Sequence, residues 1–148
     1  SGVRGSALPG RFQRLQQPVP MVLDVAHNLQ AVSYLQRKIT EVQPKGKIFA
    51  IFGMLADKDY QAVIEVMQPV ISDWACCDLP TGRSLRAELL VNRIQAEGGR
   101  AERFGNVAVA LDQLAGRVSK DDLLLVFGSF YTVSEALKHL EVSQWMTG

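Results

Sequence analysis

The sequence predicts an α/β fold of the Rossmann-like, doubly wound type, with helices on both faces of a mostly parallel sheet of about six strands. Short apolar runs rich in β-branched residues alternate with stretches of helical spacing, and about five such units follow one another from residue 21 onward. Gly, Pro and Asn residues separate the units. This alternation is typical of parallel strands joined by crossover helices.

The 148 residues predict one α/β domain preceded by an entering arm. The arm covers residues 1–20 and is punctuated by Pro9, Pro18 and Pro20. Within it, residues 10–17 alternate loosely between apolar and polar side chains, which predicts a short edge strand. The domain proper takes up residues 21–148.

The first unit of the domain is a strand over residues 21–26 and a helix that Asn28 caps and that runs to Val42. The second unit is a strand over 47–55 and a helix over 59–71, which Pro69 ends or bends early. The core side chains expected from this second helix are Val63, Val66, Met67 and Val70.

The third unit is a strand over residues 74–79 and a helix over 84–97, which the pair Gly98-Gly99 ends. This helix is expected to bury Leu85, Leu89, Leu90 and Ile94.

The fourth unit is a strand over 101–104 and a helix over 106–118, expected to bury Val107, Ala110, Leu111 and Leu114. A last strand over 122–127 precedes a helix from Thr132 to Leu140.

Composition excludes several classes of partner. The 16 basic and 15 acidic residues are spread along the chain and leave a net charge of +1, so nucleic acid and anionic membrane surfaces are not expected partners. No apolar run reaches the ~20 residues of a membrane helix, and no signal peptide is recognisable, which predicts a cytoplasmic protein. The two cysteines, Cys76 and Cys77, are adjacent in an apolar stretch and are expected to be reduced core residues.

In doubly wound sheets, ligands bind beyond the carboxyl ends of the strands. The first strand ends in Asp24, and His27 and Asn28 follow, so an acid, an imidazole and an amide meet where the helix begins. These side chains suit a ligand site. Equally, Asn28 could only cap the helix, Asp24 could accept backbone bonds, and His27 could be a solvated histidine.

The last strand ends in Gly128 and Ser129, where backbone, a hydroxyl and a helix N-terminus favour an anion such as a carboxylate. A strand-to-helix turn in which Thr132 is the N-cap and Glu135 completes a capping box explains the same residues. After the second strand, Asp57 and Asp59 read as helix-start acids rather than metal ligands.

Two nucleotide-binding motifs are absent. Gly46-Lys47 is not part of a G-x-x-x-x-G-K-[ST] sequence, so this chain has no P-loop for a triphosphate. The turn after the first strand lacks G-x-G-x-x-G, which disfavours a dinucleotide dehydrogenase.

Four segments resemble, in order and spacing, the folylpolyglutamate synthase/dihydrofolate synthase branch of the Mur ligase family, and they span nearly the whole chain. They are Leu8-Pro-Gly-Arg-Phe-Gln13, Asp24-Val-Ala-His-Asn28, Gly53-Met-Leu-Ala-Asp-Lys-Asp59 and Gly128-Ser-Phe-Tyr-Thr132. Two positions depart from many relatives, which have glycine at Val25 and proline at Leu29.

The resemblance implies a carboxy-terminal domain of an ATP-dependent, ADP-forming acid–amino-acid ligase. An amino-terminal domain outside this chain would carry the P-loop, the Mg²⁺ ligands and most of the pterin site. The γ-phosphate of ATP would pass to a carboxylate of dihydropteroate or tetrahydrofolate, and L-glutamate would displace the phosphate to form an amide. The chain alone is therefore expected to be inactive.

By the same resemblance, Arg11, Asp24 and Asn28 match the side of the site that binds ATP, and no residue of this chain is expected to bind a metal. His27 and Ser129 match the catalytic side near the incoming glutamate. An arginine of the loop after the third strand, Arg83 or Arg86, is a further candidate for binding a carboxylate.

Two other interpretations stay open at this stage. One is a ligase of peptidoglycan precursors from the same superfamily. The other is a non-catalytic nucleotide-binding module that shares only the fold. For the folate ligase, a monomer that docks on its own amino-terminal domain is expected.

Overall fold

The structure is a computed structural model and describes residues 10–147. Residues 1–9 of the predicted arm, which include Leu8 and Pro9 of the first family-like segment, lie outside the described residues. None of the helices in residues 10–147 combines the length and apolarity that a membrane crossing needs.

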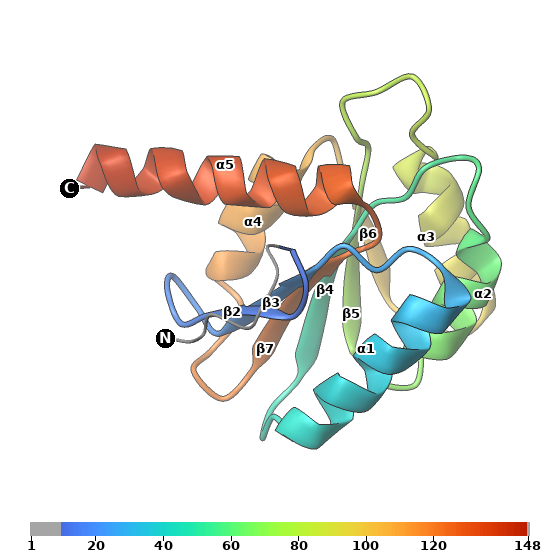
Figure 1. The fold of residues 1–148 in the computed structure, drawn as a ribbon, viewed down its shortest axis with the longest axis horizontal. Helices are drawn as coiled ribbons and strands as arrows, with labels where there is room; N and C mark the ends of the chain where they lie inside the picture. Colours follow the sequence, from blue (N-terminus) through green and yellow to red (C-terminus); the bar gives the residue numbers. More distant parts are fainter. Residues whose placement is uncertain (1–9, 148) are drawn as a thin grey trace.

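One six-stranded sheet forms the centre of the molecule, with the strand order β2-β3-β7-β4-β5-β6 (Figure 1). Only β2 is antiparallel to its neighbour; the other five strands run parallel. The strands are β2 Gln13–Leu15, β3 Met21–Asp24, β4 Ile48–Phe52, β5 Asp73–Cys77, β6 Ala101–Phe104 and β7 Leu123–Phe127. The predicted fold class and the edge strand of the arm are confirmed.

Within residues 10–147, five helices cover the two faces of this sheet (Figure 1). They are α1 Leu29–Val42, α2 Tyr60–Met67, α3 Ala87–Ala96, α4 Val107–Ala115 and α5 Phe130–Thr147. Apolar residues of α1, α2 and α3 form one core layer with one face of the sheet, and those of α4 and α5 form a second layer with the other face.

The central strands are apolar along their whole length because both of their faces are buried. Every residue of β4 and of β7 is buried. Side chains of one strand alternate between the two layers, so that Val22 of β3 joins the first layer while Met21 and Leu23 join the second.

Between β3 and β7 the connections change from one face of the sheet to the other, which makes a topological switch point. The chain proceeds outward from β4 through β5 to β6, and then returns to place β7 between β3 and β4. The helices that follow β3 and β4 pack on one face, whereas the helix that follows β7 packs on the other. Connections that leave neighbouring strands toward opposite faces leave a crevice at the carboxyl ends, which is where such sheets bind ligands.

Several element predictions are confirmed. Asn28 caps α1 as predicted, and the predicted helix starts Asp59 and Asn106 also act as caps: in each case a side-chain oxygen accepts the amide of the residue three positions later. The helix α2 ends before Pro69. All four residues expected in the core from α4 are buried: Val107, Ala110, Leu111 and Leu114.

Two helix predictions are wrong in their details. Leu89 is 40% exposed, and the buried face of α3 consists of Ala87, Leu90 and Ile94. Leu85 lies ahead of α3, in a loop where its amide donates to the carbonyl of Met54, so its spacing from Leu89 is not a helical repeat.

The last helix begins at Phe130 rather than at Thr132. The hydroxyl of Ser129 accepts the amide of Thr132, the bond that an N-cap residue makes with the third helical residue. Glu135 is therefore not part of a capping box and instead lies 3.4 Å from Lys138. In α2, Ile64 is fully buried and Val66 is partly buried, while Val70, which was expected in this helix, lies after its end and is partly buried against the same core layer.

Candidate functional site

The candidate site lies at the carboxyl ends of β3, β7 and β4. The register pairs Asp24 with Phe127 and Phe127 with Phe52, so these strand ends are level with one another. The amide of Gly128 also donates to the carbonyl of Ala26 at 3.1 Å, which joins the turn after β7 to the turn after β3. Segments far apart in sequence thus form one continuous rim.

Asp24 occupies the end of β3, is 6% exposed, and uses both carboxylate oxygens. Its Oδ1 accepts the amide of Ala26 at 2.9 Å, and its Oδ2 accepts the amide of Phe12 at 2.9 Å. Burial raises the pKa of Asp24 above its usual value, while the two amide bonds and the charge of Arg11 lower it. Asp24 therefore ties the arm to the first strand, as the structural interpretation of this residue required.

Arg11 lies on the arm between two residues in the left-handed region, Gly10 (φ 78°) and Phe12 (φ 44°). The carbonyl of Gly10 accepts the amide of Val25 at 2.6 Å. A Cβ atom at Gly10 would approach Cγ1 of Val25 to 2.8 Å, so glycine is needed for this close contact. The side chain of Arg11 is exposed, and among the described residues it forms no ion pair.

His27 and Asn28 follow on the same turn. The carbonyl of Val25 lies 2.9 Å from Nδ1 of His27 and can only accept, so Nδ1 carries the proton and the neutral ring presents the lone pair of Nε2. The Oδ1 atom of Asn28 accepts the amide of Ala31 at 2.9 Å and caps α1. This bond leaves the Nδ2 donors of the exposed Asn28 for a ligand.

Ser129 is 2% exposed and belongs to a chain of buried hydroxyls. Thr132 donates its only hydroxyl hydrogen to the carbonyl of Gly53 at 2.9 Å. In the 2.8 Å contact between the two hydroxyls, Ser129 is therefore the donor and Thr132 the acceptor. In this conformation Ser129 has no hydrogen left for a carboxylate, so a direct bond to glutamate requires its hydroxyl to rotate away from Thr132.

Gly128 and Gly53 allow the turns after β7 and β4 to touch. Gly128 has φ 117°, and a Cβ atom there would collide with the carbonyl oxygen of Gly53. A Cβ atom at Gly53 would lie 2.8 Å from the side chain of Leu79. Gly128 was expected to let a ligand approach the backbone; in the structure, its missing side chain makes room for the turn after β4.

The outer part of the rim is formed by the loops after β4 and β5, which pair through an isolated bridge between Leu55 and Ser84. Arg83 and Arg86 lie on the second of these loops with exposed side chains. Asp59 caps α2, as expected of a helix-start acid, and Asp57 lies 3.7 Å from Lys58. No group of three or more potential metal ligands occurs in the described part of the chain.

Three residues of the rim had no predicted role in ligand binding. Phe12 supplies the amide that Asp24 accepts, Thr132 joins Ser129 to Gly53, and Phe130 is an aromatic side chain 70% exposed at the start of α5. A non-glycine residue in the left-handed region, such as Phe12, has no signature in the sequence. Thr132 was correctly expected at the start of the last helix. It was expected to be the N-cap residue, however, and Ser129 holds that position.

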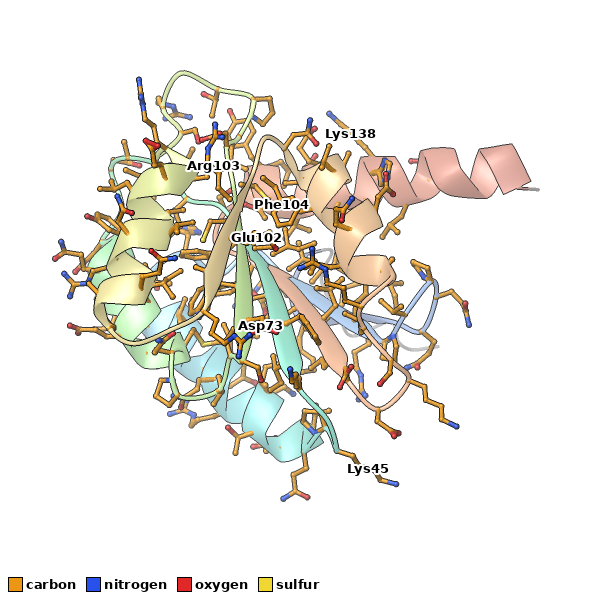
Figure 2. The ribbon with its side chains drawn as sticks, turned by 180° about the vertical axis from the view of Figure 1, so that it is seen from behind. Lys45, Asp73, Glu102, Arg103, Phe104 and Lys138 are labelled. Atoms are coloured by element: carbon orange, nitrogen blue, oxygen red, sulfur yellow. The ribbon has the colours of Figure 1, made fainter. Side chains whose placement is uncertain are left out.

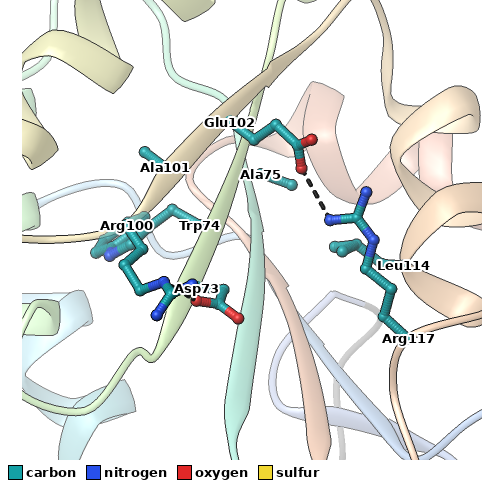
Figure 3. A pocket seen from close by; sticks show the side chains of 8 residues that line it. All are labelled: Asp73, Trp74, Ala75, Arg100, Ala101, Glu102, Leu114 and Arg117. Carbon is teal, nitrogen blue, oxygen red and sulfur yellow. Dashed lines mark hydrogen bonds and ion pairs between the residues drawn. The ribbon is translucent and has the colours of Figure 1, made fainter.

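A pocket of about 260 Å³ lies on the other edge of the sheet, where β5 and β6 begin (Figure 3). Figure 2 shows Asp73 nearer to the Lys45 end of the sheet than Arg103 and Phe104 are. The charged side chains that line the pocket form two ion pairs, Arg100 with Asp73 at 3.3 Å and Arg117 with Glu102 at 2.8 Å. None of its lining residues belongs to the rim.

A comparison with protein families decides what this rim belongs to. Residues 10–130 match the model of the Mur ligase, glutamate ligase domain. The chain belongs to the Mur ligase family. The matched region contains Arg11, Asp24, His27, Asn28 and Ser129.

Curated relatives of this Mur ligase domain include several proteins named dihydrofolate synthase/folylpolyglutamate synthase. The protein of Buchnera aphidicola subsp. Schizaphis graminum is 38% identical over 135 residues, which cover 91% of this chain and 32% of the relative. The Escherichia coli K12 protein is 33% identical over 140 residues, covering 95% of this chain and 32% of the relative. The Mur ligase domain described here thus spans about a third of their length.

Solved structures agree with this assignment. E. coli FolC in complex with DHPP and ADP superposes with a TM-score of 0.88 at 31% identity, covering 97% of this chain and 34% of that one. A bifunctional folylpolyglutamate synthase/dihydrofolate synthase with Mn, AMPPNP and L-glutamate bound gives a TM-score of 0.84 at 32% identity. The match covers 91% of this chain and 32% of that one. The fold of the Mur ligase domain and its C-terminal place in such enzymes follow.

Proposed function

We propose that this Mur ligase domain works in an ATP-dependent ligase that joins L-glutamate to dihydropteroate and to folates through an acyl phosphate. The observation that carries the proposal is the likeness, over nine-tenths of the chain, to relatives named dihydrofolate synthase/folylpolyglutamate synthase. The other two thirds of those relatives would correspond to an amino-terminal ATPase domain that docks on the rim.

The proposed reaction has two steps. A carboxylate oxygen of the folate-type substrate attacks the γ-phosphorus of ATP, and the bond to the β-phosphate oxygen breaks to release ADP. The amine of glutamate, after losing a proton, then attacks the acyl carbon, and inorganic phosphate leaves. Both steps need reactants that are aligned and shielded from water, which closure of two domains over the rim would achieve.

In this scheme Arg11 binds phosphate oxygens, because its guanidinium is exposed and forms no ion pair among the described residues. Asp24 and Asn28 belong to the nucleotide side: each Asp24 oxygen keeps a second lone pair for a hydroxyl donor, and Asn28 has its Nδ2 donors. ATP chemistry also requires Mg²⁺, which neutralises phosphate charge and which we assign to the amino-terminal domain.

His27 and Ser129 belong to the glutamate side. The Nε2 atom of His27 can accept a hydrogen from the glutamate ammonium, and the protonated ring can bind a carboxylate. Ser129 contributes through the start of α5, which favours a carboxylate, and through its hydroxyl once this turns outward.

A cytoplasmic, monomeric enzyme remains part of the proposal, and the free thiols of Cys76 and Cys77 suit a reducing compartment.

The proposal is tested in the complete ligase by replacing Arg11 with alanine. We expect kcat/KM for ATP to fall by roughly 100-fold, since a charge-assisted bond to phosphate is lost. Arg100→Ala is the matched control, because Arg100 is an exposed arginine on the opposite edge of the sheet. It should leave kcat/KM unchanged.

Assays with dihydropteroate and with a nucleotide-linked muramoyl peptide separate the folate ligase from a peptidoglycan ligase. Turnover of the muramoyl substrate alone would overturn the folate assignment. Equal activity of Arg11→Ala and the unmodified ligase would remove Arg11 from the site.

A further inference from the structure

The arm is joined to the first strand by a side chain that bridges two backbone segments. The two oxygens of Asp24 accept the amides of Phe12 and Ala26, each at 2.9 Å. The carbonyl of Gly10 accepts the amide of Val25 at 2.6 Å on the same stretch. Residues 10–12 are therefore held against the turn after β3 from both ends.

Phe12 adopts a backbone conformation that its side chain does not favour. At φ 44° it lies in the left-handed region, which persists in a non-glycine residue only where surrounding contacts enforce it. Its amide is held by Asp24, and its partly buried ring packs against the core layer beneath α1. Nζ of Lys38, on α1, lies 5.1 Å from the centroid of that ring.

These contacts bear on Arg11, which is flanked by Gly10 and Phe12. Because both neighbours hold left-handed backbone, the direction in which the Arg11 side chain leaves the arm is set on both sides. The charge of Arg11 lowers the pKa of Asp24, so the guanidinium lies within electrostatic reach of that carboxylate. Arg11 forms no ion pair with any of the described residues.

We propose that Asp24, Phe12 and Lys38 form a latch that positions Arg11 at the rim. Phe12 and Lys38 are then positioning residues for the ligase, and Asp24 acts on the nucleotide through Arg11 in addition to any direct contact. This inference rests on the proposed function in one respect, that Arg11 binds the phosphates. The latch itself can be measured without any ligand.

The first experiment measures amide hydrogen exchange of this chain by NMR. In Asp24→Asn the side-chain NH₂ cannot accept a hydrogen bond, so the Phe12 or the Ala26 amide should exchange roughly 10-fold faster or more. Lys38→Met removes the charge over Phe12 and should speed exchange of the Phe12 amide by roughly 3-fold. Lys38→Arg keeps a positive charge there and should leave the exchange rate as in the unmodified chain. Amides of β7 should be unchanged.

Lys120→Met is the control for Lys38→Met, because Lys120 is an exposed lysine of the loop between α4 and β7. It should leave exchange of the Phe12 amide unaltered. The latch is refuted if exchange at Phe12 is the same in the unmodified chain and in Lys38→Met, whatever the stability of Asp24→Asn.

The second experiment is a double-mutant cycle in the complete ligase, with ADP affinity as the readout. Lys38→Met should weaken ADP binding by roughly 3-fold when Arg11 is present and should add nothing in an Arg11→Ala background. An equal loss in both backgrounds would show that Lys38 does not act through Arg11 and would overturn the positioning role.

If Arg11→Ala itself leaves ADP affinity unchanged, the phosphate contact of the proposed function fails. The exchange rates then still decide whether the latch exists.

Discussion

Gly128 shows how a single residue sets the geometry of the rim. It has φ 117°, its amide donates to Ala26, and its Cα hydrogen faces the carbonyl of Gly53 so closely that no side chain fits. The same turn holds Ser129 and Thr132 in a hydroxyl chain that ends on Gly53. The turns after β3, β7 and β4 are thus joined at one glycine.

Gly128→Ala should destabilise the domain by about 3 kcal/mol or more, because it adds left-handed strain and a collision with the backbone of Gly53. Urea denaturation of the two chains measures this difference in the free energy of unfolding. Gly105→Ala is the control: Gly105 has no neighbour within 4 Å of a built Cβ atom, and its substitution should change stability by less than about 0.5 kcal/mol. Equal stabilities for both variants would refute the close-contact argument.

At the scale of one element, α3 shows where periodicity misleads. Counted from Leu85, the leucines suggest a face that includes Leu89. The helix begins only at Ala87, where Asp78 accepts the Ala87 amide at 2.8 Å, and its buried face is Ala87, Leu90 and Ile94. The start of a helix therefore decides which of two adjacent leucines enters the core.

Replacing each of these adjacent leucines by alanine tests that face. Leu90→Ala removes a fully buried side chain and should cost about 2–5 kcal/mol of unfolding free energy. Leu89→Ala removes a side chain that is 40% exposed and should cost no more than about 1 kcal/mol. The original prediction of a buried Leu89 would be recovered if thermal or urea denaturation gave similar losses for both.

At the scale of the whole molecule, two core layers enclose the sheet. Adjacent residues of β5 show this: Cys76 packs in the layer with α1, α2 and α3, and Cys77 packs in the layer with α4 and α5. Burial raises the pKa of the Cys76 thiol, and burial together with the charge of Asp78 raises that of Cys77 to about 12. Since the thiolate is the reactive form, the burial and the raised pKa of both thiols predict unreactive cysteines in the folded chain.

We expect neither cysteine to react with a thiol reagent such as DTNB at pH 8 unless the chain unfolds. Both should become reactive together along the urea unfolding curve, because each depends on a layer that is lost when the sheet is lost. Fast modification of one cysteine in the absence of urea would mean that its core layer opens independently.

Local sequence signals determined most of the architecture. Alternating apolar strands and amphipathic helices depend on contacts within a few residues, and the order and type of these elements, with the cap at Asn28, were predicted correctly, whereas the starts of α3 and α5 were not. The rule that doubly wound sheets bind ligands at strand carboxyl ends also located the rim. The family-like segments supplied the candidate side chains.

Only the tertiary structure decided how those side chains are used. Asp24 accepts the amide of Phe12, 12 positions earlier, and Thr132 donates to Gly53, 79 positions earlier. The first bond arises from the antiparallel pairing of β2 with β3, and the second from the order β3-β7-β4, which brings three strand ends to one edge. A sequence names the groups that can donate and accept, but the packing of the sheet selects their partners.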